Sequence, residues 1–115
     1  METPERLAEG EVHVLRAMLS RPPLPVHECE SLVLPEERER AARYHQQADR
    51  HRHLIGRAVL RFALGRLLDV APAAVALRLS AFGKPSCDGG PSFNIAHSGD
   101  EVLVALASCG RLGVD

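Results

Sequence analysis

The sequence predicts an α+β domain in which one long amphipathic helix packs on a mainly antiparallel sheet. Apolar residues recur every three or four positions between residues 54 and 67, which is the pattern of a single buried helical stripe. After residue 74 the apolar period changes to two, in short runs separated by turn-forming residues, which favours strands joined by hairpins. A chain of 115 residues, of which 45% are hydrophobic and 25% charged, suits one small globular domain or half of a larger one.

The first third of the chain is expected to hold one strand and one polar helix. Residues 12–19 alternate in part between apolar and polar types and predict a short strand, which the prolines that follow it end. Residues 26–34 are expected to be irregular or helical in part. Pro35 suits the first turn of a helix, and the glutamates just after it suit the positive helix end, so a helix is expected from Pro35 to about Tyr44.

The long helix is expected to begin after a break near residues 46–49. Its buried stripe consists of Leu54, Ile55, Ala58, Val59, Phe62, Ala63 and Leu67. The sheet is expected to pack on Ile55, Val59 and Phe62, with Phe93 or Leu106 on the opposing side. The arginines of the helix, including Arg57 and Arg61 one turn apart on the same face, are interpreted as a solvated surface whose stems cover apolar groups.

The last third of the chain is expected to form strands and turns. Residues 75–80, 93–97 and 102–106 alternate between apolar and other types and predict strands. Residues 83–91 are rich in glycine and proline and predict a loop. Residues 112–115 are expected to begin a further strand.

Composition argues against several classes of function. A net charge of -1 and an aromatic content of 3% leave neither a basic surface nor stacking platforms for nucleic acid. The sequence contains no run of roughly 20 apolar residues, so no membrane span is expected. The acidic start lacks the pattern of a signal peptide, and Cys29, Cys87 and Cys109 are spaced as free thiols, so we expect a cytoplasmic protein.

Four residues could carry chemistry, although each also has an ordinary structural interpretation. Lys84 lies between a glycine and a proline, where a cation suits a phosphate, but a lone loop lysine is usually a solvated charge. His97 and Ser98, at a strand end, could donate hydrogen bonds to a phosphate or serve only the fold. Asp115 could offer its carboxylate to Mg²⁺, which prefers oxygen ligands, or be an ordinary aspartate.

Three motifs in a fixed order connect these residues with a known family. The runs FGKP at 82–85, FNIAHSGD at 93–100 and GVD at 113–115 follow a polar segment that starts with LPEER at 34–38. In this order the motifs resemble the N-terminal half of the Sfp-type 4'-phosphopantetheinyl transferases, with a likeness that extends from about residue 34 to the last residue.

The resemblance implies an enzyme that transfers 4'-phosphopantetheine from coenzyme A to a serine of an acyl or peptidyl carrier protein with Mg²⁺. Members of the family consist of two similar halves with coenzyme A in the cleft between them. Residues 1–115 would then be the N-terminal subdomain, inactive alone, with the C-terminal half or a self-associated copy as its partner. The alternative is a half-domain that binds coenzyme A or a protein without catalysing transfer.

The resemblance also assigns roles to individual residues. Lys84 and His97 match residues that contact the phosphates of coenzyme A, and Asp115 matches the first acid of the G-[IV]-D-x-E motif, a Mg²⁺ ligand. Arg52 and Arg40 match basic positions near the 3'-phosphate.

Some positions are expected to shape the site or to weaken it. Ser98 belongs to the expected coenzyme A site, where it and Asn94 would hold the corner beside the histidine in shape. Ala96 stands where many members have serine, and Glu37 stands where lysine is frequent, so both are expected to weaken anion binding.

Overall fold

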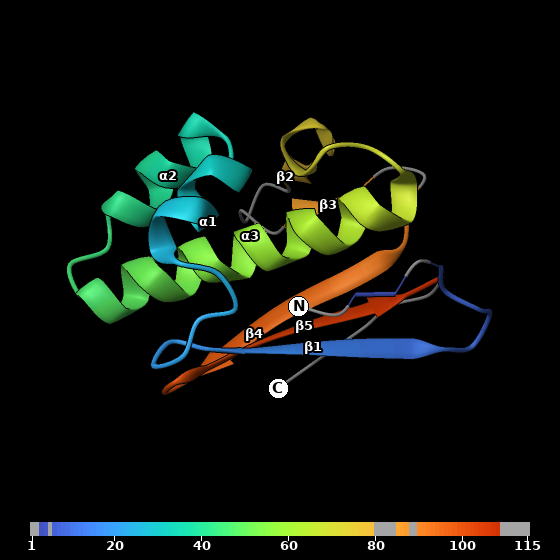
Figure 1. Cartoon of the computed structure of the whole chain (residues 1–115), viewed down its shortest axis with the longest axis horizontal. Helices are drawn as coiled ribbons and strands as arrows, with labels where there is room; N and C mark the ends of the chain where they lie inside the picture. The colour runs from blue at the N-terminus through green and yellow to red at the C-terminus, as the bar shows by residue number, and fades with distance from the viewer. Residues whose placement is uncertain (1–2, 5, 80–84, 88–89, 109–115) are drawn as a thin grey trace.

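The computed structural model describes residues 3–4, 6–79, 85–87 and 90–108, and it confirms the predicted α+β class (Figure 1). Its elements, in chain order, are β1 (Val12–Met18), α1 (Val26–Leu32), α2 (Pro35–Ala42), α3 (Gln47–Leu68), the 3-10 turn η1 (Pro72–Ala74), β2 (Arg78–Leu79), β3 (Pro85–Ser86), β4 (Ser92–Ser98) and β5 (Glu101–Ala107). The first strand, the helix that starts at Pro35 and the break before the long helix all agree with the sequence pattern.

The main sheet is antiparallel, with β5 between β1 and β4. β4 and β5 form a hairpin through Gly99, whose φ of 58° is easy for glycine, and the next residue, Asp100. Asp100 also joins the hairpin to the end of β1, because Ser20 donates a backbone hydrogen bond of 2.9 Å and a hydroxyl hydrogen bond of 2.5 Å to its carboxylate. The turn between β4 and β5 is therefore fixed to the end of β1.

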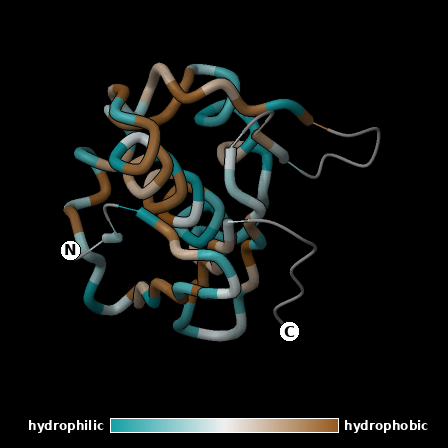
Figure 2. The backbone as a smooth tube through the Cα atoms, turned by 90° about the vertical axis from the view of Figure 1, so that its right-hand side faces the viewer, coloured by the Kyte–Doolittle hydropathy of each residue, from teal (hydrophilic) through white to brown (hydrophobic). Residues whose placement is uncertain are grey.

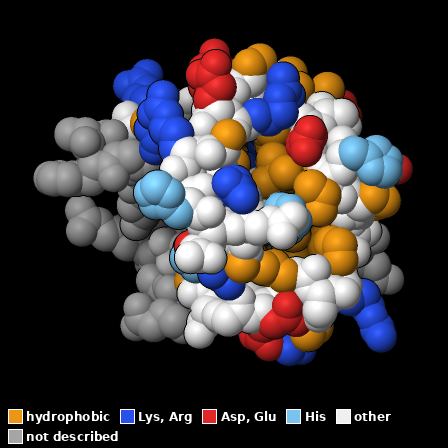
Figure 3. All heavy atoms as spheres, turned by 90° about the vertical axis from the view of Figure 1, so that its left-hand side faces the viewer, with side chains coloured by type: hydrophobic (Ala, Val, Ile, Leu, Met, Phe, Trp, Pro, Cys, Tyr) orange, Lys and Arg blue, Asp and Glu red, His pale blue; other side chains and the backbone are white. Residues whose placement is uncertain are grey.

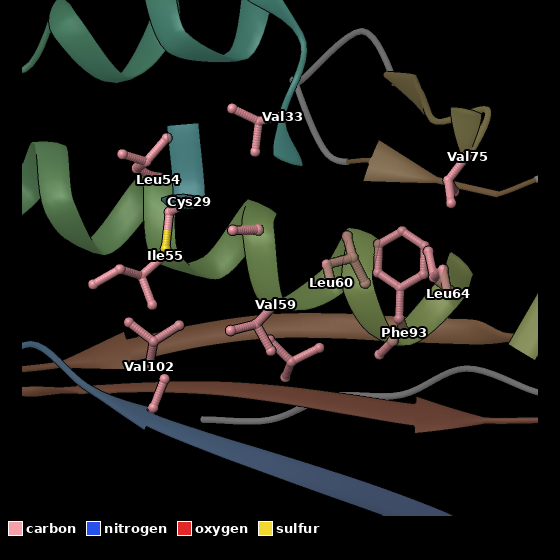
Figure 4. Packing of buried hydrophobic residues seen from close by; sticks show 14 of the residues in the cluster. Cys29, Val33, Leu54, Ile55, Val59, Leu60, Leu64, Val75, Phe93 and Val102 are labelled. Carbon is pink, nitrogen blue, oxygen red and sulfur yellow. The ribbon is translucent and has the colours of Figure 1, made fainter. Parts of the chain in front are cut away.

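α3 lies along one face of this sheet, and α1 and α2 cover the other side of the helix (Figure 1). Figure 4 shows Ile55 and Val59 on the sheet side of α3, facing Val102, while Cys29 of α1 lies on the far side. The helix approaches the sheet closely at Gly56, where a Cβ atom would lie 3.3 Å from a side-chain carbon of Ile95. Figure 2, which looks roughly along the helix, shows the chain wrapped around it.

The end of α3 depends on a second glycine. A Cβ atom on Gly65 would lie 2.7 Å from the carbonyl oxygen of Val70, too close for any other residue without a backbone shift. That approach exists because Asp69 adopts a left-handed conformation with φ 56°, and the amide of Val70 donates a hydrogen bond of 2.9 Å to the Gly65 carbonyl. The chain therefore turns back sharply after α3 and enters η1.

Three expectations about the elements are corrected by the structure. The strand expected over 75–80 is only two residues long, Arg78–Leu79, because it pairs only with the equally short β3. β3 itself lies inside the expected loop 83–91, where a short edge strand tolerates Pro85 despite its missing N–H group. Phe62 is half-buried and lies outside the hydrophobic core, whereas Ile55, Val59, Phe93 and Leu106 are in it. The strand expected over 112–115 lies outside the described residues.

The outer face of the main sheet carries exposed apolar side chains. Val12 and Val14 of β1 are 53% and 56% exposed. Their neighbours across the ladder, Ala107 and Ala105, are buried, so the exposed apolar surface at this place belongs to the two valines. Among the described residues, none of the helices is both long and apolar enough to cross a membrane.

Candidate functional site

A buried ion cluster joins α2 to α3. Glu37 of α2 accepts a hydrogen bond of 2.6 Å from Nε of Arg61 and a longer contact of 3.5 Å from Arg57. Both arginines are buried, with 6% of Arg57 and 1% of Arg61 exposed. The expectation of a solvated arginine face is therefore wrong for this pair. The physical reason is that α2 packs over α3 at this point and supplies the carboxylate that buried guanidinium groups require.

Glu37 and Arg61 also complete backbone hydrogen bonds. The amide of Leu34, at the start of α2, donates to Glu37 at 2.9 Å, and Arg61 donates to the carbonyl oxygens of Pro72 and Val75 at 3.0 and 2.8 Å. Burial lowers the pKa of Arg57, although the charge of Glu37 opposes that effect. Glu37 therefore has a structural role in this chain, since it holds two buried cations and a helix start.

The cluster forms the floor of a cavity of about 410 Å³ between α2, α3 and β2. The cationic and imidazole side chains that line it are Arg40 and Arg43 from the α2 segment and His53, Arg57 and Arg61 from α3. Glu36, Glu37 and Glu39 also contribute to the lining, but Glu37 is already paired with arginines. Figure 3 views the end of the molecule where α3 begins, and basic side chains and histidines are visible together on it.

His53, in the cavity wall, has an unusual environment for a titratable side chain. Its Nε2 atom is enclosed and has no hydrogen-bond partner among the residues that the structure describes. Its ring lies 5.6 Å from the ring of Tyr44, centre to centre. Burial, and then the positive charges of Arg57 and Arg40, lower the pKa of His53 to about 4. The imidazole is therefore neutral near neutral pH.

Arg52 does not line the cavity but braces the β4–β5 turn beside it. Its guanidinium donates to the carbonyl oxygen of Gly99 at 2.5 Å and to the carboxylate of Asp49 at 2.6 Å. The turn is thus held by α3 on one side and by β1 on the other. Arg52 is placed to position the end of β4, where His97 and Ser98 lie.

His97 and Ser98 lie next to each other in sequence but on opposite faces of β4, because side chains alternate along a strand. His97 shares the face that packs toward α3, and of the groups that affect the pKa of His53 it has the smallest effect. Ser98, with Ala96 and Asn94, belongs to the outer face. Both His97 and Ser98 are exposed.

Two of the predicted site residues, Lys84 and Asp115, lie outside the described residues. Within the described ranges no group of three or more histidine, cysteine, aspartate or glutamate side chains could hold a metal ion. The expected Mg²⁺ site at Asp115 therefore remains a prediction from sequence.

The structure brings Arg40, Arg52 and His97 of the predicted site to the same end of α3 and adds residues that the sequence analysis did not assign. Arg43, His53 and Arg57 line the cavity without having been assigned to a site. A signal was present in the sequence, because positions 53, 57 and 61 are four residues apart and must share one helix face. What the pattern could not show is that α2 covers this face.

Comparisons with known proteins identify the family of the chain. The family model described as 4'-phosphopantetheinyl transferase, N-terminal, matches residues 25–110. A phosphopantetheinyl transferase of Thraustochytrium sp. is 38% identical over 70% of this chain and 29% of its own length. The 4'-phosphopantetheinyl transferase HetI of Nostoc sp. is 31% identical over 95% of this chain and 48% of its own length.

A third relative is the 4'-phosphopantetheinyl transferase Sfp of Bacillus subtilis, which is 33% identical over 74% of this chain and 38% of its own length. The chain spans less than half the length of each of these relatives. The match to the family model covers α1 through β5, which includes the cavity and the β4–β5 turn. The chain belongs to the 4'-phosphopantetheinyl transferase family, to which it is matched through the N-terminal domain.

Proposed function

We propose that this chain is the nucleotide-binding half of an enzyme that transfers 4'-phosphopantetheine from coenzyme A to a serine of an acyl or peptidyl carrier protein. The observation that supports this role is the arginine-lined cavity at the end of the long helix, beside the strand end that carries His97. Guanidinium groups in a partly enclosed site attract phosphates more strongly than they would in water, because the local dielectric constant is lower. The protein is proposed to act in the cytoplasm.

The proposed arrangement distributes the phosphates of coenzyme A over two places. Arg40 and Arg57, in the cavity, would bind the 3'-phosphate, and His97 with Lys84 would bind the pyrophosphate. Arg52 would act indirectly, by holding the turn that fixes the end of β4. Glu37 would weaken the anion site less than the sequence suggests, because its charge is offset by two arginines.

The transfer step itself would need groups beyond these residues. Mg²⁺, with Asp115 as one proposed ligand, would supply the positive charge that offsets the pyrophosphate as its bond breaks. The residues of this chain would bind and orient coenzyme A, while a second half would supply further metal ligands and the base that takes the proton of the carrier serine.

Isolated from a second half, this chain should bind coenzyme A weakly, with a Kd on the order of 0.1 to 1 mM, and should not modify a carrier protein. His97→Ala and Lys84→Ala should each weaken binding, since each removes a phosphate contact. His27→Ala is the matched control, because His27 is exposed on α1, away from the cavity. The measurements are a coenzyme A titration followed by NMR, and mass spectrometry of a carrier domain incubated with coenzyme A and Mg²⁺.

Equal binding by all four proteins would remove His97 and Lys84 from the site. Carrier modification by the isolated chain would contradict the requirement for a second half. Binding that depends on both residues, but without transfer by any longer form of the protein, would favour the alternative of a half-domain that only binds coenzyme A.

We further propose that the outer face of the main sheet contacts the second half, or a second copy of the chain when that half is absent. The exposure of Val12 and Val14 supports this proposal, since side chains of this size are usually buried in a sheet. The isolated chain should therefore self-associate, and Val14→Lys should shift it toward the monomer in sedimentation velocity runs. Val70→Lys, which changes an exposed valine beyond the end of α3, is the control. A chain that is monomeric at all concentrations would contradict the proposal.

A further inference from the structure

His53 lines the cavity with its Nε2 atom enclosed and without a hydrogen-bond partner among the described residues. Its neutral state is due first to burial and then to positive charges that a bound anion would offset. Arg57 of the same helix and Arg40 and Glu37 of α2 line the cavity together with His53. Arg57, Arg40 and, to the smallest extent, His97 of β4 lower the pKa of the ring, whereas the carboxylate of Glu37 raises it. The ring of Tyr44 packs beside it. Apart from Glu37, whose carboxylate is shared with two arginines, the charged and titratable groups that act on this imidazole disfavour its protonated form.

We propose that a phosphate monoester enters the cavity between α2 and α3 together with a proton that His53 takes up. The proposal rests on the proposed function, because the monoester in question is the 3'-phosphate of coenzyme A. A phosphate dianion beside Arg40 and Arg57 would offset the positive potential that now opposes protonation of the imidazole. The protonated ring would in turn add a cation to the anion site.

The direction of the pH dependence follows from linkage. The pKa of His53 is about 4 in the free protein, and a bound anion must raise it. Between the free and the bound values, the complex holds one more proton than the separate partners. Affinity therefore increases as pH falls through this window. Above the bound-state pKa the imidazole is neutral in both states, so its protonation no longer makes affinity depend on pH.

The test is to measure the protonation of His53 directly, by NMR of its imidazole nitrogens between pH 4 and 8, in the free chain and with saturating coenzyme A. We expect the pKa of His53 to rise from about 4 to roughly 6 to 6.5 on binding. Dephospho-coenzyme A, which has the pyrophosphate but lacks the 3'-phosphate, should raise it less. The resonances of His27, exposed on α1, identify any general effect of the ligand on the sample.

Two variants separate coupling from simple loss of structure. In Arg40→Gln the free pKa of His53 should be higher than in the wild type, and coenzyme A should raise it less, whereas Arg21→Gln, an exposed arginine outside the cavity, should behave as the wild type. His53→Gln cannot titrate, so its Kd for coenzyme A should exceed the wild-type Kd by about 3- to 10-fold more at pH 5.5 than at pH 8. Comparing the two proteins at the same pH cancels the titration of the ligand itself.

The possible results lead to different conclusions. Binding of coenzyme A with an unchanged pKa of His53 would overturn this inference and leave the proposed function intact. An equal rise with dephospho-coenzyme A would show that the pyrophosphate occupies the cavity, which overturns the assignment of the monoester. Failure of both nucleotides to bind, at any pH at which the chain is folded, would overturn the proposed function as well.

Discussion

Replacing Glu37 by glutamine should destabilise the domain by about 3 to 5 kcal/mol, which is the usual cost of removing one partner from a buried ion pair. Glutamine keeps the shape of the side chain and an acceptor for Arg61, so the loss comes mainly from the charge. Arg57 and Arg61 would remain buried, with nothing else at 4 Å or less to neutralise them in the part of the chain that the structure describes. The measurement is the free energy of unfolding in urea, followed by circular dichroism.

Glu39→Gln is the matched control for this experiment. Glu39 lies on the same helix but is exposed, so its replacement should change stability by less than about 0.5 kcal/mol. The double variant Glu37→Gln and Arg57→Gln should lose less than the sum of the single variants, because the second change removes one uncompensated charge. If Glu37→Gln is as stable as the wild type, the buried cluster described here does not form.

Leu64→Ala should destabilise the domain by about 2 to 5 kcal/mol, whereas Phe62→Ala should cost clearly less. The side chain of Leu64 is fully buried within the core shown in Figure 4, so its truncation would leave a cavity that close packing on all sides prevents from closing. Phe62 is only half-buried, and its larger ring contributes less because part of it stays in water in the folded protein.

Thermal and urea unfolding of these two variants measure which face of α3 the core occupies. Leu68→Ala, which truncates an exposed leucine at the end of the same helix, controls for any general effect on helix formation. A greater loss in Phe62→Ala than in Leu64→Ala would mean that the helix is rotated relative to the arrangement described here.

These two predictions concern the parts of the structure that the sequence pattern did not give. The stripe that repeats every three or four residues identified the helix and most of its buried positions, including Ile55 and Val59. It included Phe62 because periodicity gives the direction of a face but not how far along the helix that face is covered. Phe62 lies within about 20° of Ile55 around the helix, yet its side chain is half-exposed.

The candidate site shows a similar division. The motifs around His97 predicted a strand end and a turn, and those features depend on local preferences of the chain, such as the positive φ of Gly99. The loop around Lys84 and the terminal Asp115 lie outside the described residues, so their roles remain predictions. The cavity residues Arg43, His53 and Arg57 were not assigned from sequence, because a polar residue on a helix is assigned to solvent unless something is known to cover it.

The sequence by itself determined the α+β class, the order of the main elements and the family, because these depend on local periodicity, on turn-forming residues and on short motifs in a fixed order. Only the tertiary structure decided that Arg57 and Arg61 are buried, that Glu37 neutralises them and that His53 stays neutral in a basic cavity. The physical reason is that burial and electrostatic environment depend on α2, more than ten residues away in the chain from the arginines that it covers.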